Sequence, residues 1–278
     1  MELNSMLKKL YNDESKHSRY QNIPKFVREA ANYSEEIDES WRGDTARYEY
    51  VKRTINIDDG EIIADIGANT GFFTLSLANE NKNAKFIAYE PNINHAAFIS
   101  EIADHFQLSN VEIRGQSIGL KEINQISVSD RMILFNVLHH AGVDFDKELV
   151  RTKADFKEYA FQYLNQLRKK TKQLLFQIGY NWGGDKSNPI VDVNHVSEMT
   201  LYVSELFMNA GWQIKTIAFY SYSNKKGLYE DIHDDLLRGI IQNARDASVI
   251  EGLEKHVHKL NMMGNSEFYK RPIFVFES

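Results

Sequence analysis

Two glycines four residues apart stand in a short stretch that is suited to contact a bound nucleotide. The stretch reads Ala64-Asp65-Ile66-Gly67-Ala68-Asn69-Thr70-Gly71-Phe72-Phe73, and it predicts a buried strand that turns into a helix. Glycine has no Cβ, so a ligand can approach the backbone, and the first N–H groups of the helix face the same space. The spacing differs from G-x-G-x-x-G, and the stretch has no P-loop lysine. The pattern indicates a nucleotide-type site without pyrophosphate.

An acidic residue ends the next apolar run, about twenty residues after the glycine turn. The run Phe86-Ile87-Ala88-Tyr89-Glu90-Pro91 predicts a strand with the Glu90 carboxylate at its end. Two neighbouring acceptor oxygens suit the vicinal diol of a ribose. The distance from the glycine turn favours ribose binding over the alternative, a solvated loop carboxylate.

Paired histidines follow the fourth predicted strand, in the run Phe135-Asn136-Val137-Leu138-His139-His140-Ala141-Gly142. Imidazole is the side chain best suited to remove a hydroxyl proton near neutral pH, so His139 and His140 are the candidate catalytic bases. The alternative is that at least one of them is a buried, hydrogen-bonded structural histidine. A nucleophile that is already ionised, such as a phosphate, needs little help from a base, because alignment supplies much of the rate.

A loop dense in aromatic and polar residues follows the fifth predicted strand, at residues 179–186. Tyr180 and Trp182 are candidates to stack on a sugar or a base, and Asp185 is a candidate to accept a substrate hydroxyl. The alternative is a glycine-rich loop that only reverses the chain.

The elements that must position these residues alternate between β-rich and helical runs, which predicts an α/β protein with a parallel sheet covered on both faces. Seven strands are expected, at residues 61–67, 85–90, 111–118, 131–138, 173–180, 212–220 and 272–277. Helices are expected at residues 70–79, 94–106, 147–170 and 195–210. The segment between the third and fourth strands has room for about one or two helical turns.

Two segments lie outside this alternation. Residues 1–60 are predicted to be helical, and because no long Gly/Ser/Pro linker follows them, they form a cap on the domain of residues 61–278. Residues 221–271 form a long insertion between the last two strands, with helical stretches of its own, for example at residues 231–247. The insertion is either a lid or specificity element, or a disordered or oligomer-forming segment.

Composition narrows the class of protein. The 278 residues, 42% of them hydrophobic, can bury one large core. A formal charge of −6 gives no overall positive field that would attract nucleic acid. The basic run at residues 168–172 is better explained as the end of a helix. The absence of cysteine excludes disulfides, thiolate metal sites and a cysteine nucleophile. Without a long apolar run or a secretory segment, we expect a cytoplasmic protein with no membrane span and no metal.

Taken together, residues from about 39 to 189 resemble class I S-adenosylmethionine-dependent methyltransferases. Within that class they look most like the methyltransferase part of the kinase–methyltransferases that terminate bacterial O-antigen polysaccharides, and more loosely like small enzymes that modify the tRNA wobble uridine. The residues that carry the resemblance are Trp41, Gly43-Asp44, Arg47, Asp65-Ile66-Gly67, Gly71-Phe72-Phe73-Thr74-Leu75-Ser76-Leu77-Ala78 and Val137-Leu138-His139-His140. The resemblance implies a Rossmann-like seven-stranded sheet and S-adenosylmethionine as cofactor.

The resemblance also implies roles for single residues. Asp65 orients the glycine turn and offsets the positive charge of the cofactor. Adenine lies near Gln116 or Ser117, where many family members have an acidic residue, and Asn92 and Ile93 complete its slot. Candidates to pair with the cofactor carboxylate are Tyr20, Tyr33, Arg42, Arg47 and Lys52. The expected cofactor-binding residues are Asp65, Gly67, Ala68, Asn69, Gly71, Phe72, Glu90, Pro91, Gln116, Ser117, Asn136, Leu138, Arg42 and Arg47.

The sequence thus predicts an enzyme that transfers a methyl group from S-adenosylmethionine to an oxygen of a sugar-containing or other small polar acceptor. Two alternatives stay open. The first is an RNA-modifying methyltransferase, which requires salt-dependent RNA binding through residues 169–172 and the insertion. The second is a catalytically inactive, cofactor-binding partner subunit.

Overall fold

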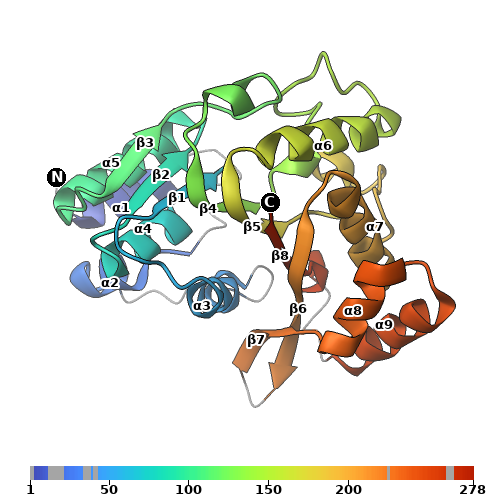
Figure 1. The fold of residues 1–278 in the computed structure, drawn as a ribbon. Helices are drawn as coiled ribbons and strands as arrows, with labels where there is room; N and C mark the ends of the chain where they lie inside the picture. The colour runs from blue at the N-terminus through green and yellow to red at the C-terminus, as the bar shows by residue number, and fades with distance from the viewer. Residues whose placement is uncertain (1–2, 12–21, 34–38, 40–42, 224–225, 261–265) are drawn as a thin grey trace. The chain divides into compact units, whose positions relative to one another are not determined.

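The computed structural model describes residues 3–11, 22–33, 39, 43–223, 226–260 and 266–278 (Figure 1). The chain folds as two compact units. Unit 1 consists of Met1–Ile118 with Ser129–Ile133, and unit 2 consists of Gly119–Val128 with Leu134–Ser278. The strand β4 (Ser129–Phe135) begins in unit 1 and ends in unit 2. Residue 60, the boundary predicted between the cap and the main domain, lies within unit 1.

The described residues form an eight-stranded sheet in the order β3-β2-β1-β4-β5-β8-β6-β7. In unit 1, β1 (Ile62–Ile66) lies between β2 (Lys85–Tyr89) and β4, and β2 pairs with β3 (Val111–Arg114); all three pairings are parallel. All seven predicted strands are present. The predicted parallel sheet is present in unit 1, and the C-terminal strands add antiparallel pairings to it.

The strands of unit 2 that depart from the parallel pattern are those next to the insertion. Here β8 (Ile273–Glu277) is antiparallel to both β5 (Thr171–Gln177) and β6 (Gln213–Ser223). An eighth strand, β7 (Lys226–Asp231), pairs antiparallel with β6 and was not expected. Antiparallel neighbours need no crossover helix, so the chain can reverse directly from β6 into β7.

The helices that follow the strands match the expected ones, with shifts at their ends. They are α4 (Phe72–Glu80), α5 (Ile93–His105), α6 (Lys153–Leu167) and α7 (Val196–Asn209). The start of α6 is six residues later than predicted, because Thr152 and Asp155 form a capping box there. A short 3-10 turn, Glu122–Gln125, occupies the segment before β4, as its length predicted.

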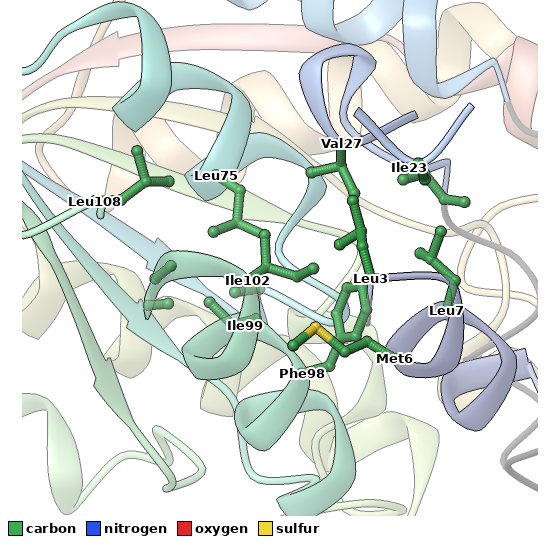
Figure 2. Packing of buried hydrophobic residues seen from close by; sticks show 14 residues of the cluster. Leu3, Met6, Leu7, Ile23, Val27, Leu75, Phe98, Ile99, Ile102 and Leu108 are labelled. Atoms are coloured by element: carbon green, nitrogen blue, oxygen red, sulfur yellow. The ribbon is translucent and has the colours of Figure 1, made fainter. Parts of the chain in front are cut away.

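The N-terminal segment packs onto the sheet-covering helix of its own unit. The helix α1 (Leu3–Tyr11) and the short helix α2 (Lys25–Ala30) contribute Leu3, Met6 and Val27 to a hydrophobic cluster with Phe98 and Ile99 of α5 (Figure 2). A third helix, α3 (Asp44–Thr54), precedes β1. The helices α1 and α2 therefore share a core with the helix that begins just after Glu90.

The insertion has regular structure in its described part. After β7 it forms α8 (Asp234–Asn243) and α9 (Ala247–Lys259), which pack against α7, and then a 3-10 turn at Glu267–Lys270 (Figure 1). Arg245 joins Glu198 and Glu205 of α7 to the loop between α8 and α9. The helix expected at 231–247 is shorter than predicted, and α9 is a second helical stretch of the insertion. None of the described helices has the length and apolarity needed to cross a membrane.

Candidate functional site

The glycine turn of unit 1 is held by backbone hydrogen bonds from the end of β2. The N–H groups of Gly67 and Ala68 both donate to the carbonyl oxygen of Tyr89, at 2.8 and 3.2 Å. Gly67, Asn69 and Gly71 all adopt left-handed backbone conformations, with φ of 73°, 54° and 79°. A Cβ on Gly71 would lie 2.7 Å from Cγ1 of Ile99, so glycine is required there both for its φ and for space. Two backbone hydrogen bonds thus join the turn to the end of β2.

Glu90 is buried, with 6% of its surface exposed, and its carboxylate fastens the glycine turn. Oε2 accepts a hydrogen bond from the N–H of Asn69 at 2.7 Å, and Oε1 accepts one from the N–H of Asn92 at 2.8 Å. A carboxylate has about four lone-pair sites, so these two amides leave acceptor capacity for the two hydroxyls of a ribose. The geometry fits the role predicted for Glu90.

Asp65 lies at the end of β1, buried beside the same turn. Its Oδ2 accepts a hydrogen bond from the hydroxyl of Thr74 at 2.7 Å. Burial raises the pKa of Asp65 to about 6, against the opposing effect of Thr74, and the negative charge of Glu90 raises the pKa further. A cationic ligand near both carboxylates would relieve this repulsion, which fits the positive charge of S-adenosylmethionine.

Asn69 provides an independent indication of a ligand. Its Oδ1 is buried and has no hydrogen-bond partner among the described residues. A buried acceptor without a partner is costly, by about 1–3 kcal/mol. A ligand that donates an N–H, such as the ammonium group of an aminoacyl moiety, would satisfy Oδ1 of Asn69. The residues of the glycine turn therefore fit the predicted cofactor.

The end of β3 lies next to Glu90. The N–H groups of Glu90 and Gln116 donate to the carbonyl oxygen of Arg114, at 3.0 and 2.9 Å, and β3 ends there, four residues earlier than predicted. Gln116 and Ser117 are partly buried. Ile93, the first residue of α5, is 80% exposed, which is high for a large apolar side chain. An exposed apolar side chain three residues after Glu90 suits the predicted wall of an adenine slot.

The residues predicted to pair with the carboxylate of the cofactor have different surroundings. Tyr20 and Arg42 lie outside the described residues, as does Trp41 of the resemblance motif. Lys52 pairs with Glu80 at 2.8 Å, and Tyr33 packs against the α5 cluster. Arg47 is buried in an ion pair with Asp44, and its guanidinium carbon lies 5.5 Å from the ring centre of Phe73, in the first turn of α4. Arg47 thus contacts the first turn of α4, next to the glycine turn, whereas Lys52 contacts Glu80 at the other end of that helix.

In unit 2, the residues after β4 are held by the end of the insertion. Asn136 has a left-handed φ of 60°. Its Nδ2 donates to Oε1 of Gln177 at 2.9 Å, and its Oδ1 accepts from Nη1 of Arg271 at 2.7 Å. Leu138, a second predicted cofactor residue, is fully buried. The side-chain amide of Asn136 is thus fixed by neighbours of its own unit.

His139 is a structural histidine. Only 2% of its surface is exposed, and its Nδ1 accepts a hydrogen bond from the N–H of Gly179 at 3.3 Å. Burial holds the pKa of His139 well below its ordinary value, and the charges of His140 and Arg271 lower the pKa further. The ring also fills the space beside Gly179, where a Cβ would lie 2.6 Å from Nε2. The assignment of His139 as a base is therefore wrong, and His140 is the remaining candidate.

Two of the three residues predicted to bind substrate form hydrogen bonds within the local fold. Tyr180 is completely buried, and its hydroxyl donates to the carbonyl oxygen of Lys270 at 2.7 Å, so no ring face is available for stacking. The Asp185 carboxylate accepts hydrogen bonds from Ser187 and Asn188 and shapes a turn. Trp182 is partly exposed, and its Nε1 donates to the carbonyl oxygen of Ala141 at 2.7 Å. Trp182 stays a candidate.

Sequence reasoning missed three residues of unit 2. Asp144 contacts His140 four residues away, a spacing that the sequence does display. Glu267 accepts hydrogen bonds from the N–H of Tyr180 and from Nδ2 of Asn181, and it pairs with Arg271. No local pattern connects Glu267 and Arg271 to residues so distant in the sequence. Among the described residues, no group of three or more histidines and acidic residues is placed to hold a metal ion.

No family model and no curated protein matches the chain. Solved structures do match it. The bifunctional kinase–methyltransferase WbdD has a TM-score of 0.52 and 13% identity, over 100% of this chain and 68% of WbdD. In another WbdD structure, with a TM-score of 0.48 and 17% identity, the match covers 83% of this chain and 46% of WbdD.

A second protein, the [4+2]-cyclase SpnF, has a TM-score of 0.50 and 13% identity, over 88% of this chain and 86% of SpnF. A methyltransferase from Aquifex aeolicus that depends on S-adenosylmethionine has a TM-score of 0.43 and 19% identity, over 70% of this chain and 94% of that protein. Identities this low concern the fold and leave the reaction to be argued from the site. The chain has the Rossmann-like α/β fold of the S-adenosylmethionine-dependent methyltransferases.

Proposed function

We propose that the protein binds S-adenosylmethionine at the glycine turn of unit 1 and transfers its methyl group to an oxygen of a small, sugar-containing acceptor. The observation that carries the proposal is the arrangement around Glu90. Its buried carboxylate fastens the glycine turn through the N–H of Asn69 and keeps acceptor capacity for a ribose.

The residues of unit 1 divide the recognition of the cofactor among them. Glu90 accepts the ribose hydroxyls, Oδ1 of Asn69 accepts from the ammonium group, and Asp65 offsets the positive charge. Ile93 covers one face of the adenine, beside Gln116. The bound cofactor supplies a methyl group that is activated for displacement by its sulfonium. The protein contributes alignment of the acceptor and exclusion of water.

The choice of a sugar-containing acceptor is supported by the resemblance of the motifs between residues 39 and 189 to O-antigen-terminating enzymes. The RNA alternative depends on the basic run at residues 168–172. Nζ of Lys170 binds the carbonyl oxygens of Asn124 and Ile126, and Nη1 of Arg168 binds that of Gly211. Two cations of the basic run are therefore engaged in packing within unit 2.

Calorimetry with S-adenosylmethionine tests the cofactor site. The Glu90→Ala variant is expected to bind the cofactor more weakly by about 1.5–3 kcal/mol, the range for a hydrogen bond to a charged group. Asp104→Asn, which removes an exposed carboxylate from α5, is the matched control and should leave binding unchanged. Thermal melting of both variants separates loss of binding from loss of fold. Unchanged affinity in a folded Glu90→Ala variant would remove Glu90 from the site.

Turnover distinguishes an enzyme from an inactive partner subunit. The purified protein is incubated with S-adenosylmethionine and methyl hexopyranosides or their 6-phosphates, and mass spectrometry follows the products. The expected result is methylated acceptor and S-adenosylhomocysteine in equal amounts. Tight cofactor binding without methylated product on these acceptors or on small polar alcohols would favour the partner-subunit alternative.

A further inference from the structure

A buried histidine of unit 1 lies beside the carboxylate that is proposed to bind the ribose. Nδ1 of His95 is 3.7 Å from Oε1 of Glu90, and only 2% of the His95 surface is exposed. This distance exceeds that of a hydrogen bond and is within that of an ion pair, which forms when the imidazole is protonated. His95 is therefore a polar neighbour of Glu90, in addition to the two backbone amides.

Asn92 places both partners of this contact. Its N–H donates to Oε1 of Glu90 at 2.8 Å, and its side-chain Oδ1 accepts hydrogen bonds from the N–H groups of Asn94 and His95, at 2.9 and 3.2 Å. Asn92 is thus the N-cap of α5 and fixes where the first turn of α5 begins relative to Glu90. Because His95 lies in that turn, its ring reaches the same carboxylate oxygen as the N–H of Asn92.

Glu90 also has an acidic neighbour, Asp65. Burial, and beyond it the negative charge of Glu90, raise the pKa of Asp65 to about 6, so the two carboxyl groups are close enough to interact. Their repulsion opposes the ionised form of Glu90, which is the form that accepts from two hydroxyls. A hydrogen on Nδ1 of His95 acts in the other direction, because the N–H of a neutral ring or the charge of an imidazolium attracts Oε1.

We propose that His95 is a positioning residue for the Glu90 carboxylate, and that it strengthens recognition of the ribose diol by acting through Glu90. The inference rests on the proposed function, in which Glu90 accepts the ribose hydroxyls. His95 attracts Oε1 while the N–H of Asn69 holds Oε2, so both oxygens of the carboxylate are oriented. A group that is oriented before its ligand arrives loses less freedom on binding.

The preference for a ribose diol measures this role, because it compares two ligands on the same protein. Calorimetry is carried out with adenosine and with 2′,3′-dideoxyadenosine, which lacks both hydroxyls. The wild-type protein should bind adenosine about 10- to 100-fold more tightly, the range for a hydrogen bond to a charged group. A variant that only loosens the fold weakens the binding of both nucleosides alike, whereas one that misplaces Glu90 lowers the ratio of their affinities.

Two polar replacements of His95 place an amide nitrogen differently. In His95→Asn the side-chain amide reaches the place of Nδ1, whereas in His95→Gln it reaches the place of Nε2. We expect His95→Asn to keep most of the preference for adenosine, and His95→Gln to reduce it at least about 3-fold, within the range for coupled neighbours. His105→Gln, which changes an exposed histidine at the other end of α5, is the matched control and should leave the preference unchanged.

A double-mutant cycle tests whether His95 acts through Glu90. In a Glu90→Gln background, His95→Gln should cause no further loss of the preference for adenosine, because the carboxylate that His95 orients is gone. Independent losses that add up would mean that His95 affects the ribose by another route, and they would overturn the positioning role. An unchanged preference in a folded His95→Gln variant would overturn it as well.

The wild-type protein offers a measurement that does not depend on the folding of a variant. The ring signals of His95, assigned by NMR in isotope-labelled protein, should shift at saturation with adenosine and clearly less with 2′,3′-dideoxyadenosine, because only adenosine donates hydrogen bonds to Glu90. Equal shifts with the two nucleosides would contradict a role of His95 in recognising the diol.

The proposed function fails on a different result. If the wild-type protein binds neither S-adenosylmethionine nor adenosine, the proposed function is overturned, and the role of His95 with it. If it binds both, and the preference for adenosine is the same in the wild type and in His95→Gln, only the role of His95 is overturned.

Discussion

Asp65 links the stability of unit 1 to pH through a single buried carboxyl group. An aspartate in an unfolded chain titrates near pH 3.9, whereas burial raises the pKa of Asp65 to about 6 in the folded state. Between these two values the folded state holds the proton and the unfolded state does not. The free energy of unfolding therefore falls as the pH rises through this window, and the stabilisation present below about pH 4 is lost above about pH 6.

Replacing Asp65 by asparagine removes the charge and keeps an oxygen for the Thr74 hydroxyl. At pH 7.5 the Asp65→Asn variant should have a free energy of unfolding higher than that of the wild type by up to about 3 kcal/mol, since each pKa unit corresponds to about 1.4 kcal/mol. At pH 4 the difference should vanish. Urea unfolding at pH 4, 5.5 and 7.5 measures it, and a difference that does not vary with pH would contradict the raised pKa of Asp65.

Gly71 allows the two requirements for glycine to be measured separately. Gly60 has a similar left-handed φ of 84°, but a Cβ there would meet no atom within 4 Å, whereas a Cβ on Gly71 would meet Ile99 at 2.7 Å. Gly60→Ala should lower the free energy of unfolding by about 1 kcal/mol, the effect of φ alone. Gly71→Ala should lower it by a further 1–3 kcal/mol or so, the usual effect of overpacking. Urea unfolding measures both variants. An equal decrease in the free energy of unfolding would show that the contact with Ile99 does not contribute to the requirement for glycine.

The candidate site shows which contacts between residues can be predicted from the sequence. Glu90 and the glycine turn were predicted because their partners follow each other at short range, around one strand and its neighbour. The surroundings of Tyr180 could not be predicted in this way: its hydroxyl donates to the carbonyl oxygen of Lys270, ninety residues away, whereas Asp185 accepts hydrogen bonds from its own turn. Burial of a polar side chain depends on what packs over it, which the local pattern does not contain.

At the scale of elements, the insertion stabilises the loop after β4 through Arg271. The Arg271 side chain is 7% exposed and contacts both Asn136 and Glu267. Removing one partner of a buried ion pair leaves the other charge uncompensated, at a loss of about 3–5 kcal/mol. Arg271→Leu should therefore lower the free energy of unfolding by about that amount.

Arg245 is the matched control for Arg271, because it pairs with Glu198 and Glu205 but is 44% exposed. Exposed ion pairs contribute about 0–1 kcal/mol each, so Arg245→Leu should lower the free energy of unfolding by no more than about 1–2 kcal/mol. Urea unfolding of both variants compares them directly. A loss in Arg271→Leu as small as that in Arg245→Leu would mean that the insertion does not stabilise the loop.

The strands and helices that could be predicted are those whose hydrophobic residues recur with the period of a strand or of a helix. All seven expected strands and the four main helices exist, with ends displaced by a few residues. The strand β7 was missed because its sequence, Lys-Gly-Leu-Tyr-Glu-Asp, is polar and pairs only with β6 along one edge. The direction of β8 was missed because it depends on the connection from β6 and not on the residues of β8 itself.

At the scale of the whole molecule, charge argues against nucleic-acid binding. The formal charge is −6, and Arg168 and Lys170 of the basic run bind backbone carbonyls. Fluorescence anisotropy with a labelled tRNA at about 50 mM salt should show no saturable binding, because phosphate contacts by lysine and arginine supply most of non-specific affinity. Binding that weakens steeply between about 50 and 200 mM salt would restore the RNA alternative.

The close packing of His139 against Gly179 limits which substitutions these two positions can tolerate during evolution. The imidazole occupies the volume that any side chain at position 179 would need, and Nε2 lies 2.6 Å from the place of its Cβ. A substitution of Gly179 by a larger residue is therefore disfavoured until His139 has been replaced. Across descendants of a common ancestor, a residue larger than glycine at position 179 should appear together with a smaller residue in place of His139, so that the two sites evolve as a pair.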